Sequence, residues 1–94
     1  MALLSQEQLD RRLATAGSWR RGTGQEIVRE LSFPDFASAI AFVDRVAELA
    51  EAANHHPDIL IHGWNKVLLT LSTHSQGGVT DADFALAGQI DELS

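Results

Sequence analysis

Residues 51–83 read EAANHHPDILIHGWNKVLLTLSTHSQGGVTDAD and contain all four histidines of the 94-residue chain. Two of these, His55 and His56, are adjacent and are followed at once by Pro57, which cannot continue a helix and favours an extended backbone in the residue before it. The stretch therefore predicts the end of a helix followed by a strand. Because imidazole titrates near neutral pH, histidines gathered at such a junction suit proton transfer or metal binding.

The same stretch predicts a hairpin and the start of a final helix. A strand over 59–62 turns at or near Gly63 into a second strand over 65–73. In the second strand one face is apolar, formed by Val67, Leu69 and Leu71. His62 is expected to be a solvated loop residue beside the turn. Thr80 is expected to cap the last helix, whose buried side is predicted to contain Phe84, Ala87, Ile90 and either Leu86 or Leu93.

Upstream of the histidines lies the longest predicted helix, from about residue 35 to residue 54. Pro34 and Asp35 open it, and apolar residues follow at helical spacing. The main stripe consists of Phe36, Ala39, Ile40, Val43, Ala47 and Ala50. A second set widens this stripe, namely Phe42, Val46, Leu49 and Ala53. This helix is expected to be the central packing element, and its C-terminal end delivers His55 and His56.

The N-terminal third completes the order of elements. Ser5 and Gln8 form a predicted capping box for a short helix that ends near Gly17, and strands over 19–21 and 25–33 follow. The resulting order is α-β-β-α-β-β-α. It predicts an α+β fold in one domain over 1–94, with a four-stranded antiparallel sheet and three helices packed on one face. The two sheet edges favour a homodimer or homotetramer.

Composition excludes several classes of function. A net charge of −6 argues against a nucleic-acid partner, because phosphate binding needs a basic surface. The absence of cysteine excludes disulfides and thiolate metal ligands. The N-terminal apolar run is too short for a signal peptide, and no later stretch is long enough to span a bilayer. We therefore expect a cytoplasmic protein with no membrane association.

The histidines suggest acid–base chemistry. Removing water from a carbon that bears a hydroxyl needs one group to protonate the leaving oxygen and another to take a proton from the adjacent atom. His55 and His56 at a helix end could converge with His74 at a strand end. Glu51, one turn before His55, or Asp83, at the start of the last helix, could orient an imidazole.

Other readings of the same residues remain open. A histidine at a helix C-terminus can be a charged cap, and Asp83 can serve only its own helix N-terminus. Glu51 can be a plain surface charge, and Trp64 can be hairpin packing or an aromatic wall for a flat heterocycle. A metal site is disfavoured because adjacent histidines project in different directions and the spacings H-x-H and H-x-x-x-H are missing.

The order and spacing of these residues resemble the pterin-4a-carbinolamine dehydratase family. The resemblance rests on Glu51–Pro57, Trp64, Ser72–His74, Gly78–Thr80 and Asp83, and extends through Phe33–Phe36 upstream and Phe84–Ala87 downstream. It covers about the last seventy residues well. Asn54 stands where an Asp is common in the family, and Ala82 where some members carry an Arg.

The resemblance implies an enzyme that dehydrates 4a-hydroxytetrahydropterin to quinonoid dihydropterin. It would recycle the tetrahydrobiopterin-type cofactor spent by aromatic amino acid hydroxylases, without a metal or bound cofactor of its own. By position, His55 and His74 would be the acid–base pair and His56 would orient the ring. The implied substrate-binding residues are Glu51, Pro57, Trp64, Thr73 and Asp83.

Two alternatives accompany this reading. Family members also serve as dimerisation cofactors of a homeodomain transcription factor, through the oligomer surface and not through the histidines. A homologue could instead act on a related pterin, for example in molybdopterin metabolism.

Overall fold

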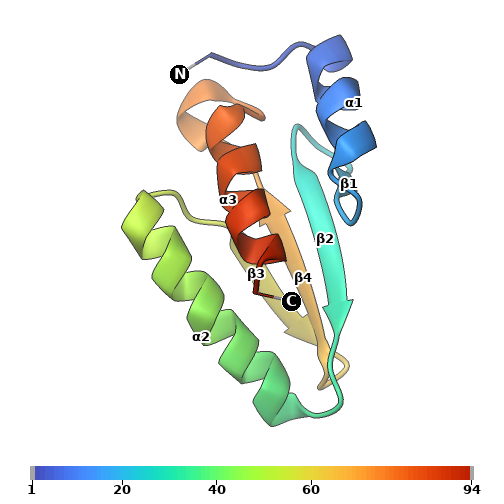
Figure 1. The fold of residues 1–94 in the computed structure, drawn as a ribbon, viewed down its shortest axis with the longest axis vertical. Helices are drawn as coiled ribbons and strands as arrows, with labels where there is room; N and C mark the ends of the chain where they lie inside the picture. Colours follow the sequence, from blue (N-terminus) through green and yellow to red (C-terminus); the bar gives the residue numbers. More distant parts are fainter. Residues whose placement is uncertain (1, 94) are drawn as a thin grey trace.

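The structure, a computed structural model, describes residues 2–93 and has the predicted order of elements (Figure 1). The helices are α1 (Gln6–Thr15), α2 (Phe36–Ala53) and α3 (Asp81–Asp91), and a short 3-10 helix, η1, spans His74–Gln76. The strands are β1 (Arg20–Arg21), β2 (Ile27–Ser32), β3 (Asp58–His62) and β4 (Lys66–Leu71). They form one antiparallel sheet in the order β1-β2-β4-β3, which confirms the predicted α+β architecture.

The core lies between the sheet and the helices. In β4, Val67, Leu69 and Leu71 have no exposed surface, as the alternation in the sequence predicts. In β2, Ile27 pairs with Leu71 and is equally buried. On the helical side, the core is completed by Leu9, Ala39, Phe42, Val46, Leu86, Ala87 and Ile90. Leu86, and not Leu93, is therefore the fully buried leucine of α3.

The buried side of α2 differs from the predicted main stripe. Ala39, Phe42, Val46 and Ala50 are buried. The prediction was wrong for Phe36, Ile40 and Ala47, and for Ala53 of the second set, because all four are exposed. The reason is that apolar residues occupy most positions around this helix, so their spacing does not fix which side meets the sheet and α3. The helix consequently presents an apolar side to solvent.

The C-terminal end of α3 is fastened to the sheet by one carboxylate. Asp91 Oδ1 accepts hydrogen bonds from Trp19 Nε1 at 2.9 Å and from Arg29 Nη1 at 2.5 Å. Trp19 is 4% exposed, and the Arg29 side chain is 13% exposed. Because Arg29 belongs to β2, this contact sets the position of α3 across the sheet.

The N-terminus of α2 is capped by Asp35. Its side chain accepts a hydrogen bond from the Ser38 backbone N–H at 2.7 Å. Hydrogen bonds from the side chain and backbone of Ser38 lower the pKa of Asp35 below its ordinary value. A lowered pKa means that the charged carboxylate adds stability above the ordinary pKa, and that this stability is lost as pH falls through the folded-state pKa.

We therefore expect Asp35→Asn to be less stable than the wild type at neutral pH, because it keeps a capping oxygen but loses the charge at a helix N-terminus. The deficit should vanish in acid, where Asp35 is protonated. Thermal unfolding of both proteins, followed from acid to neutral pH, measures this difference in stability. A deficit of the same size at neutral and acid pH would contradict a role for the charge.

Within residues 2–93, no helix has both the length and the apolar character that crossing a membrane requires.

Candidate active site

The end of α2 delivers two histidines to one end of the sheet. Asn54, directly after the helix, adopts the left-handed conformation with φ 49° and ψ 43°, and its N–H donates to the carbonyls of Ala50 and Glu51. This turn ends the helix, and Pro57 then leads the chain into β3. His55 and His56 therefore lie in a short connection between α2 and β3, as the sequence predicts.

The opposite wall comes from the end of β4. The Thr73 backbone N–H donates to the Gly78 carbonyl at 2.7 Å, which closes a tight loop. The strand was expected to run to Thr73 with His74 at its end, but β4 ends at Leu71 and His74 begins η1. Gly77, with φ 76°, ends this 3-10 turn in a conformation that glycine adopts without strain. The turn presents the His74 side chain at the surface.

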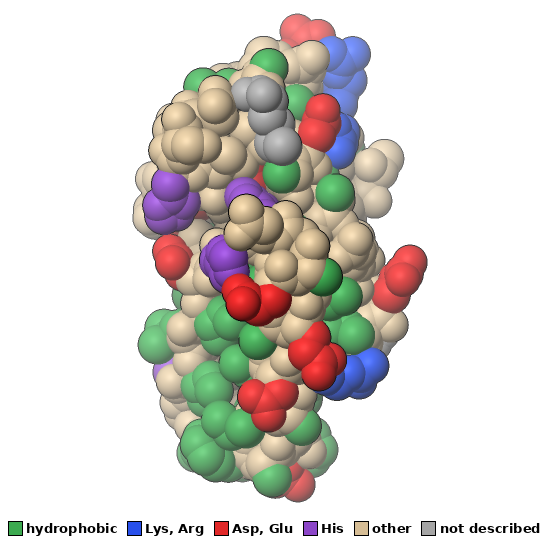
Figure 2. All heavy atoms as spheres, turned by 90° about the vertical axis from the view of Figure 1, so that its left-hand side faces the viewer, with side chains coloured by type: hydrophobic (Ala, Val, Ile, Leu, Met, Phe, Trp, Pro, Cys, Tyr) green, Lys and Arg blue, Asp and Glu red, His purple; other side chains and the backbone are tan. Residues whose placement is uncertain are grey.

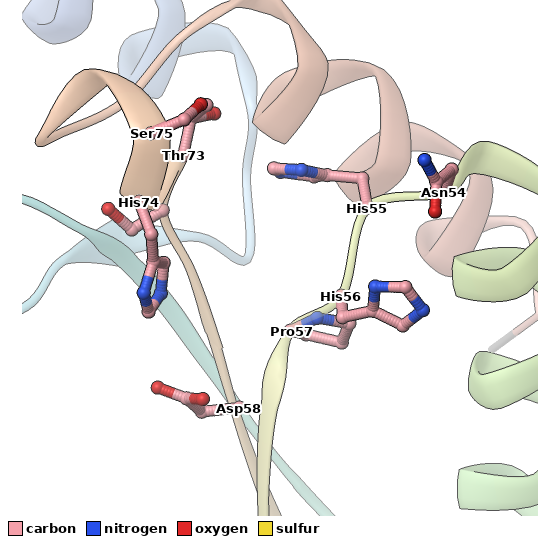
Figure 3. A pocket seen from close by; sticks show the side chains of 9 residues that line it. Asn54, His55, His56, Pro57, Asp58, Thr73, His74 and Ser75 are labelled. Atoms are coloured by element: carbon pink, nitrogen blue, oxygen red, sulfur yellow. The ribbon is translucent and has the colours of Figure 1, made fainter.

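A pocket of about 380 Å³ separates the two walls. Because Asp58 of β3 pairs with Thr70 of β4, the start of one strand and the end of the other meet at the same end of the sheet. Figure 3 shows the side chains of both walls around this space. The lining residues are Asn54, His55, His56, Pro57, Asp58, Ser72, Thr73, His74 and Ser75.

His55 is held by a buried carboxylate. Its Nε2 lies 2.5 Å from Asp83 Oδ1, and the two side chains are 15% and 0% exposed. A carboxylate offers only acceptors, so Nε2 is the protonated nitrogen and Nδ1 remains for other contacts. The possibility that Asp83 orients an imidazole is thus realised in the structure.

Asp83 is itself fixed by the start of α3. Its Oδ2 accepts hydrogen bonds at 2.9 Å from the Thr73 hydroxyl and from the Thr80 backbone N–H. The Thr80 hydroxyl lies 2.7 Å from the Thr73 oxygen and accepts from the Ala82 N–H at 3.2 Å. Asp83 is therefore both the third residue of a capping box and the partner of His55. The same carboxylate thus caps α3 and contacts His55.

His56 is arranged differently. Its Nε2 contacts Glu51 Oε2 at 2.5 Å, and both side chains are more than half exposed. In Figure 3 the ring of His56 points away from His74 and toward the end of α2. Glu51 therefore reaches the pocket through its contact with His56, since it does not line the pocket itself.

His74 is exposed, and no carboxylate of residues 2–93 forms an ion pair with its ring. Figure 3 places its ring across the pocket from His55, with the Asp58 carboxylate on its own side. Figure 2 shows histidine side chains gathered in the upper half of the face that carries α2. The ring of His74 thus remains available to a ligand in the pocket.

The remaining two predicted residues lie elsewhere. His62 is the last residue of β3 and not a loop residue, and its Nε2 lies 2.9 Å from Glu30 Oε2. Trp64 lies in the loop between β3 and β4, at the end of the hairpin opposite to the pocket. The length of β4 separates it from His74, roughly 20 Å at the rise of a strand. Within one chain, Trp64 does not join the other predicted site residues.

Four of the lining residues were not among the predicted catalytic or substrate-binding residues. These are Asn54, Asp58, Ser72 and Ser75. The position of Asp58 could have been predicted from the sequence. A residue directly after Pro57, at the start of a hairpin, must lie near the end of the returning strand. Among residues 2–93, no group of three or more His, Cys, Asp or Glu side chains is placed to hold a metal ion.

The arrangement suits proton transfer on a small polar molecule. One imidazole is fixed by a buried carboxylate, and a second faces it across a space large enough for a bicyclic ring.

Comparison with known proteins gives a consistent result. The family model described as Pterin 4 alpha carbinolamine dehydratase matches residues 2–93. A relative from Roseiflexus castenholzii is 54% identical, covering 98% of this chain and 97% of its own. One from Nocardia farcinica is also 54% identical, covering 98% of this chain and 95% of its own. The names of both give pterin-4-alpha-carbinolamine dehydratase as a provisional assignment.

Solved structures extend the comparison. The crystal structure of a transcriptional coactivator/pterin dehydratase from Brucella melitensis has a TM-score of 0.90 and 30% identity, covering 97% of each chain. A pterin dehydratase-like protein described as a RuBisCO assembly factor in the alpha-carboxysome has a TM-score of 0.67 and 31% identity. It covers 81% of this chain, and 88% of its own chain is matched.

Proposed function

Because the chain belongs to the pterin 4 alpha carbinolamine dehydratase family, we propose that it removes water from a 4a-hydroxytetrahydropterin to give the quinonoid dihydropterin. The observation that carries this proposal is the pocket of about 380 Å³ with His55 and His74 on opposite walls. Its volume is in the range of small-molecule sites.

We assign His55 as the base. Its Nε2–H is engaged by Asp83, so Nδ1 is free to accept the proton from N5 of the pterin. The buried carboxylate of Asp83 stabilises the imidazolium that forms, by the same logic as the acid–base pairs of hydrolases. The N5–H electron pair then becomes the second bond between N5 and C4a.

We assign His74 as the acid. As the bond between C4a and the hydroxyl oxygen breaks, protonated His74 gives its proton to that oxygen, which leaves as water. The substrate thereby loses one proton to His55, and its hydroxyl takes one from His74, so charge balances over the reaction. Because His74 is exposed, exchange with solvent restores both histidines to their starting forms.

The other predicted residues serve positioning roles in this proposal. His56, held by Glu51, binds the edge of the pterin ring at the mouth of the pocket. Pro57 supplies the apolar part of the pocket wall, and the Thr73 hydroxyl holds Asp83 in place by donating a hydrogen bond to its carboxylate. The substrate would be a tetrahydrobiopterin-type cofactor after its use by an aromatic amino acid hydroxylase, which makes such an enzyme the expected functional link.

The alternative is a binding role without catalysis, since one structural neighbour is called a transcriptional coactivator/pterin dehydratase and another a RuBisCO assembly factor. Such a role would use the outer surface and not the pocket. It predicts that cells tolerate the loss of His55 and His74, whereas the catalytic role predicts that they do not. A homologue specific for a related pterin would keep the histidines and differ in substrate preference.

The proposal predicts that the purified protein accelerates carbinolamine dehydration well above its spontaneous rate. The carbinolamine can be generated in situ, and the quinonoid product followed by its absorbance. The initial rate should saturate with substrate and scale with protein concentration. A folded wild-type protein that leaves the spontaneous rate unchanged would refute the proposed function.

A further inference from the structure

The pocket between the histidines contains one carboxylate that has no partner in the chain. Among its lining residues within the described part of the chain, Asp58 is the only one with a carboxylate. The two other carboxylates of the site are engaged, because Glu51 contacts His56 and Asp83 contacts His55. No described group forms a hydrogen bond or an ion pair with the Asp58 carboxylate.

The strand register fixes the position of this carboxylate. Asp58 is the first residue of β3 and pairs with Thr70 of β4. The residues on either side of Thr70 face the core, so Thr70 and its partner Asp58 project from the opposite face of the sheet. Figure 3 shows the Asp58 carboxylate on the side of the pocket where His74 lies, away from His55.

We propose that Asp58 selects the substrate by binding the 2-amino edge of the pterin ring. The inference rests on the proposed function, because it requires that a pterin occupies this pocket. It gives Asp58 a role in specificity. The two proton transfers remain with His55 and His74.

The chemistry of the ring supplies a partner for the carboxylate. A 2-amino-4-oxopterin carries two neighbouring N–H donors, one on N3 and one on the exocyclic amino nitrogen. Both point the same way in the plane of the ring, as two N–H groups of a guanidinium do. An ionised carboxylate has two acceptor oxygens and no donor, so it can accept from both N–H groups at once.

The position of Asp58 agrees with the placement of the reacting atoms. In the pterin, N5 and the amino nitrogen are attached to opposite corners of the pyrimidine ring, C4a and C2. A ring whose N5 lies at His55 therefore directs its amino edge away from His55. Figure 3 shows Asp58 on that remote side, next to the histidine assigned as the acid. The same orientation thus serves both the chemistry and the recognition of the ring.

The carboxylate also discriminates against a ring with oxygen at C2. In a 2,4-dioxo ring, a lumazine, the amino donor is replaced by a carbonyl acceptor. Asp58 then faces an oxygen that it cannot bind and that repels it. An asparagine at this position keeps one acceptor and gains a donor, which matches N3–H together with the carbonyl at C2. The preference between the two rings should therefore follow the identity of residue 58.

The first test measures the affinity for two stable dihydro rings that differ at C2. 7,8-Dihydropterin and 7,8-dihydrolumazine are each titrated into the protein at neutral pH in a calorimeter. We expect the wild type to bind 7,8-dihydropterin about 10- to 100-fold more tightly, the scale on which bidentate side chains discriminate the edges of bases. Asp58→Asn should bind 7,8-dihydrolumazine at least as tightly as 7,8-dihydropterin. Asp58→Ala should have no preference, because it offers neither a donor nor an acceptor.

Asp44→Asn is the matched control. Asp44 is an exposed carboxylate of α2 outside the pocket, so its variant should keep the wild-type ratio of the two affinities. Asp58 is exposed as well, and its variants should keep the wild-type Tm. A variant that loses the preference at unchanged Tm has lost a contact to the ligand and not the fold.

The second test uses the dehydration assay. Asp58→Ala should raise KM about tenfold, the scale of a lost hydrogen bond to a charged group, and leave kcat close to the wild-type value. This split is expected of a group that binds the ring equally well before and during the reaction. A fall in kcat at unchanged KM would contradict it.

The outcomes separate this inference from the proposed function. If Asp58→Asn and Asp58→Ala keep the wild-type ratio of affinities, the role of Asp58 is overturned, even where the wild type dehydrates the carbinolamine. A wild-type protein that shows the predicted preference but leaves the spontaneous dehydration rate unchanged would refute the proposed reaction and support the role of Asp58. Binding of neither ring would overturn both proposals.

Discussion

Replacing His74 by Ala is expected to lower the rate constant for carbinolamine dehydration by about 10²–10⁴-fold, the usual value of a general acid. The stability of the fold should hardly change. His74 is exposed at the first position of a 3-10 turn, and no carboxylate of residues 2–93 forms an ion pair with it. Steady-state kinetics and thermal unfolding of the same preparation measure both effects.

Gln76→Ala is the matched control for this variant. Gln76 is exposed in the same turn and does not line the pocket, and its backbone bond to Thr73 does not involve the side chain. It should keep wild-type kinetics and wild-type stability. If His74→Ala retained the activity of Gln76→Ala, the acid would have to be another group and the assignment of His74 would fail.

Replacing Asp83 by Ala is expected to impair both catalysis and folding. The carboxylate accepts hydrogen bonds from His55, Thr73 and the Thr80 N–H, and it is fully buried. Its removal takes one buried acceptor away from each of these donors, and each buried group that stays unsatisfied costs about 1–3 kcal/mol. A loss of about 3 kcal/mol would lower Tm by roughly 12–24 °C in a domain of this size.

Asp83→Asn separates the two roles. The amide keeps one acceptor and nearly the same volume, so we expect most of the stability to remain. Catalysis should still fall, by about 10- to 100-fold, because a neutral amide cannot stabilise the imidazolium of His55. The fall should appear in kcat more than in KM. Asp81 is an exposed carboxylate two residues earlier in the same helix, and Asp81→Asn should change neither kcat nor KM. Equal losses in the Asp81 and Asp83 variants would indicate a general effect of charge.

Much of this architecture could be predicted from the sequence because its signals are local. The capping residues Ser5, Asp35 and Thr80 each accept the hydrogen bonds that helix N-termini leave free. The alternation in β4 identifies its buried face. The His-His-Pro sequence marks the change from helix to strand, since Pro57 permits only one continuation. From these signals the order of the elements could be predicted, as could the position of His55 and His56 where a helix ends and a strand begins.

What the sequence did not predict depends on contacts between elements. An apolar helix such as α2 does not reveal which side it buries until the sheet and α3 are in place. The 3-10 turn at His74 is set by the pairing of Thr73 with Gly78, which is a tertiary contact. The isolated position of Trp64 was predictable in principle, since a turn near Gly63 places its neighbour at the far end of the hairpin. The family resemblance, and not this geometry, is what assigns Trp64 to the site.

The double use of Asp83 has a consequence for dynamics. Fraying of the first turn of α3 breaks the capping box, and the same event releases His55 from its carboxylate. The site and the helix end therefore open and close as one cooperative unit. Amide hydrogen exchange at Thr80, whose N–H is bound to Asp83, would report the fraction of molecules with a disassembled site even in the absence of any ligand. Ligand binding that slows this exchange would measure how strongly the substrate favours the assembled form.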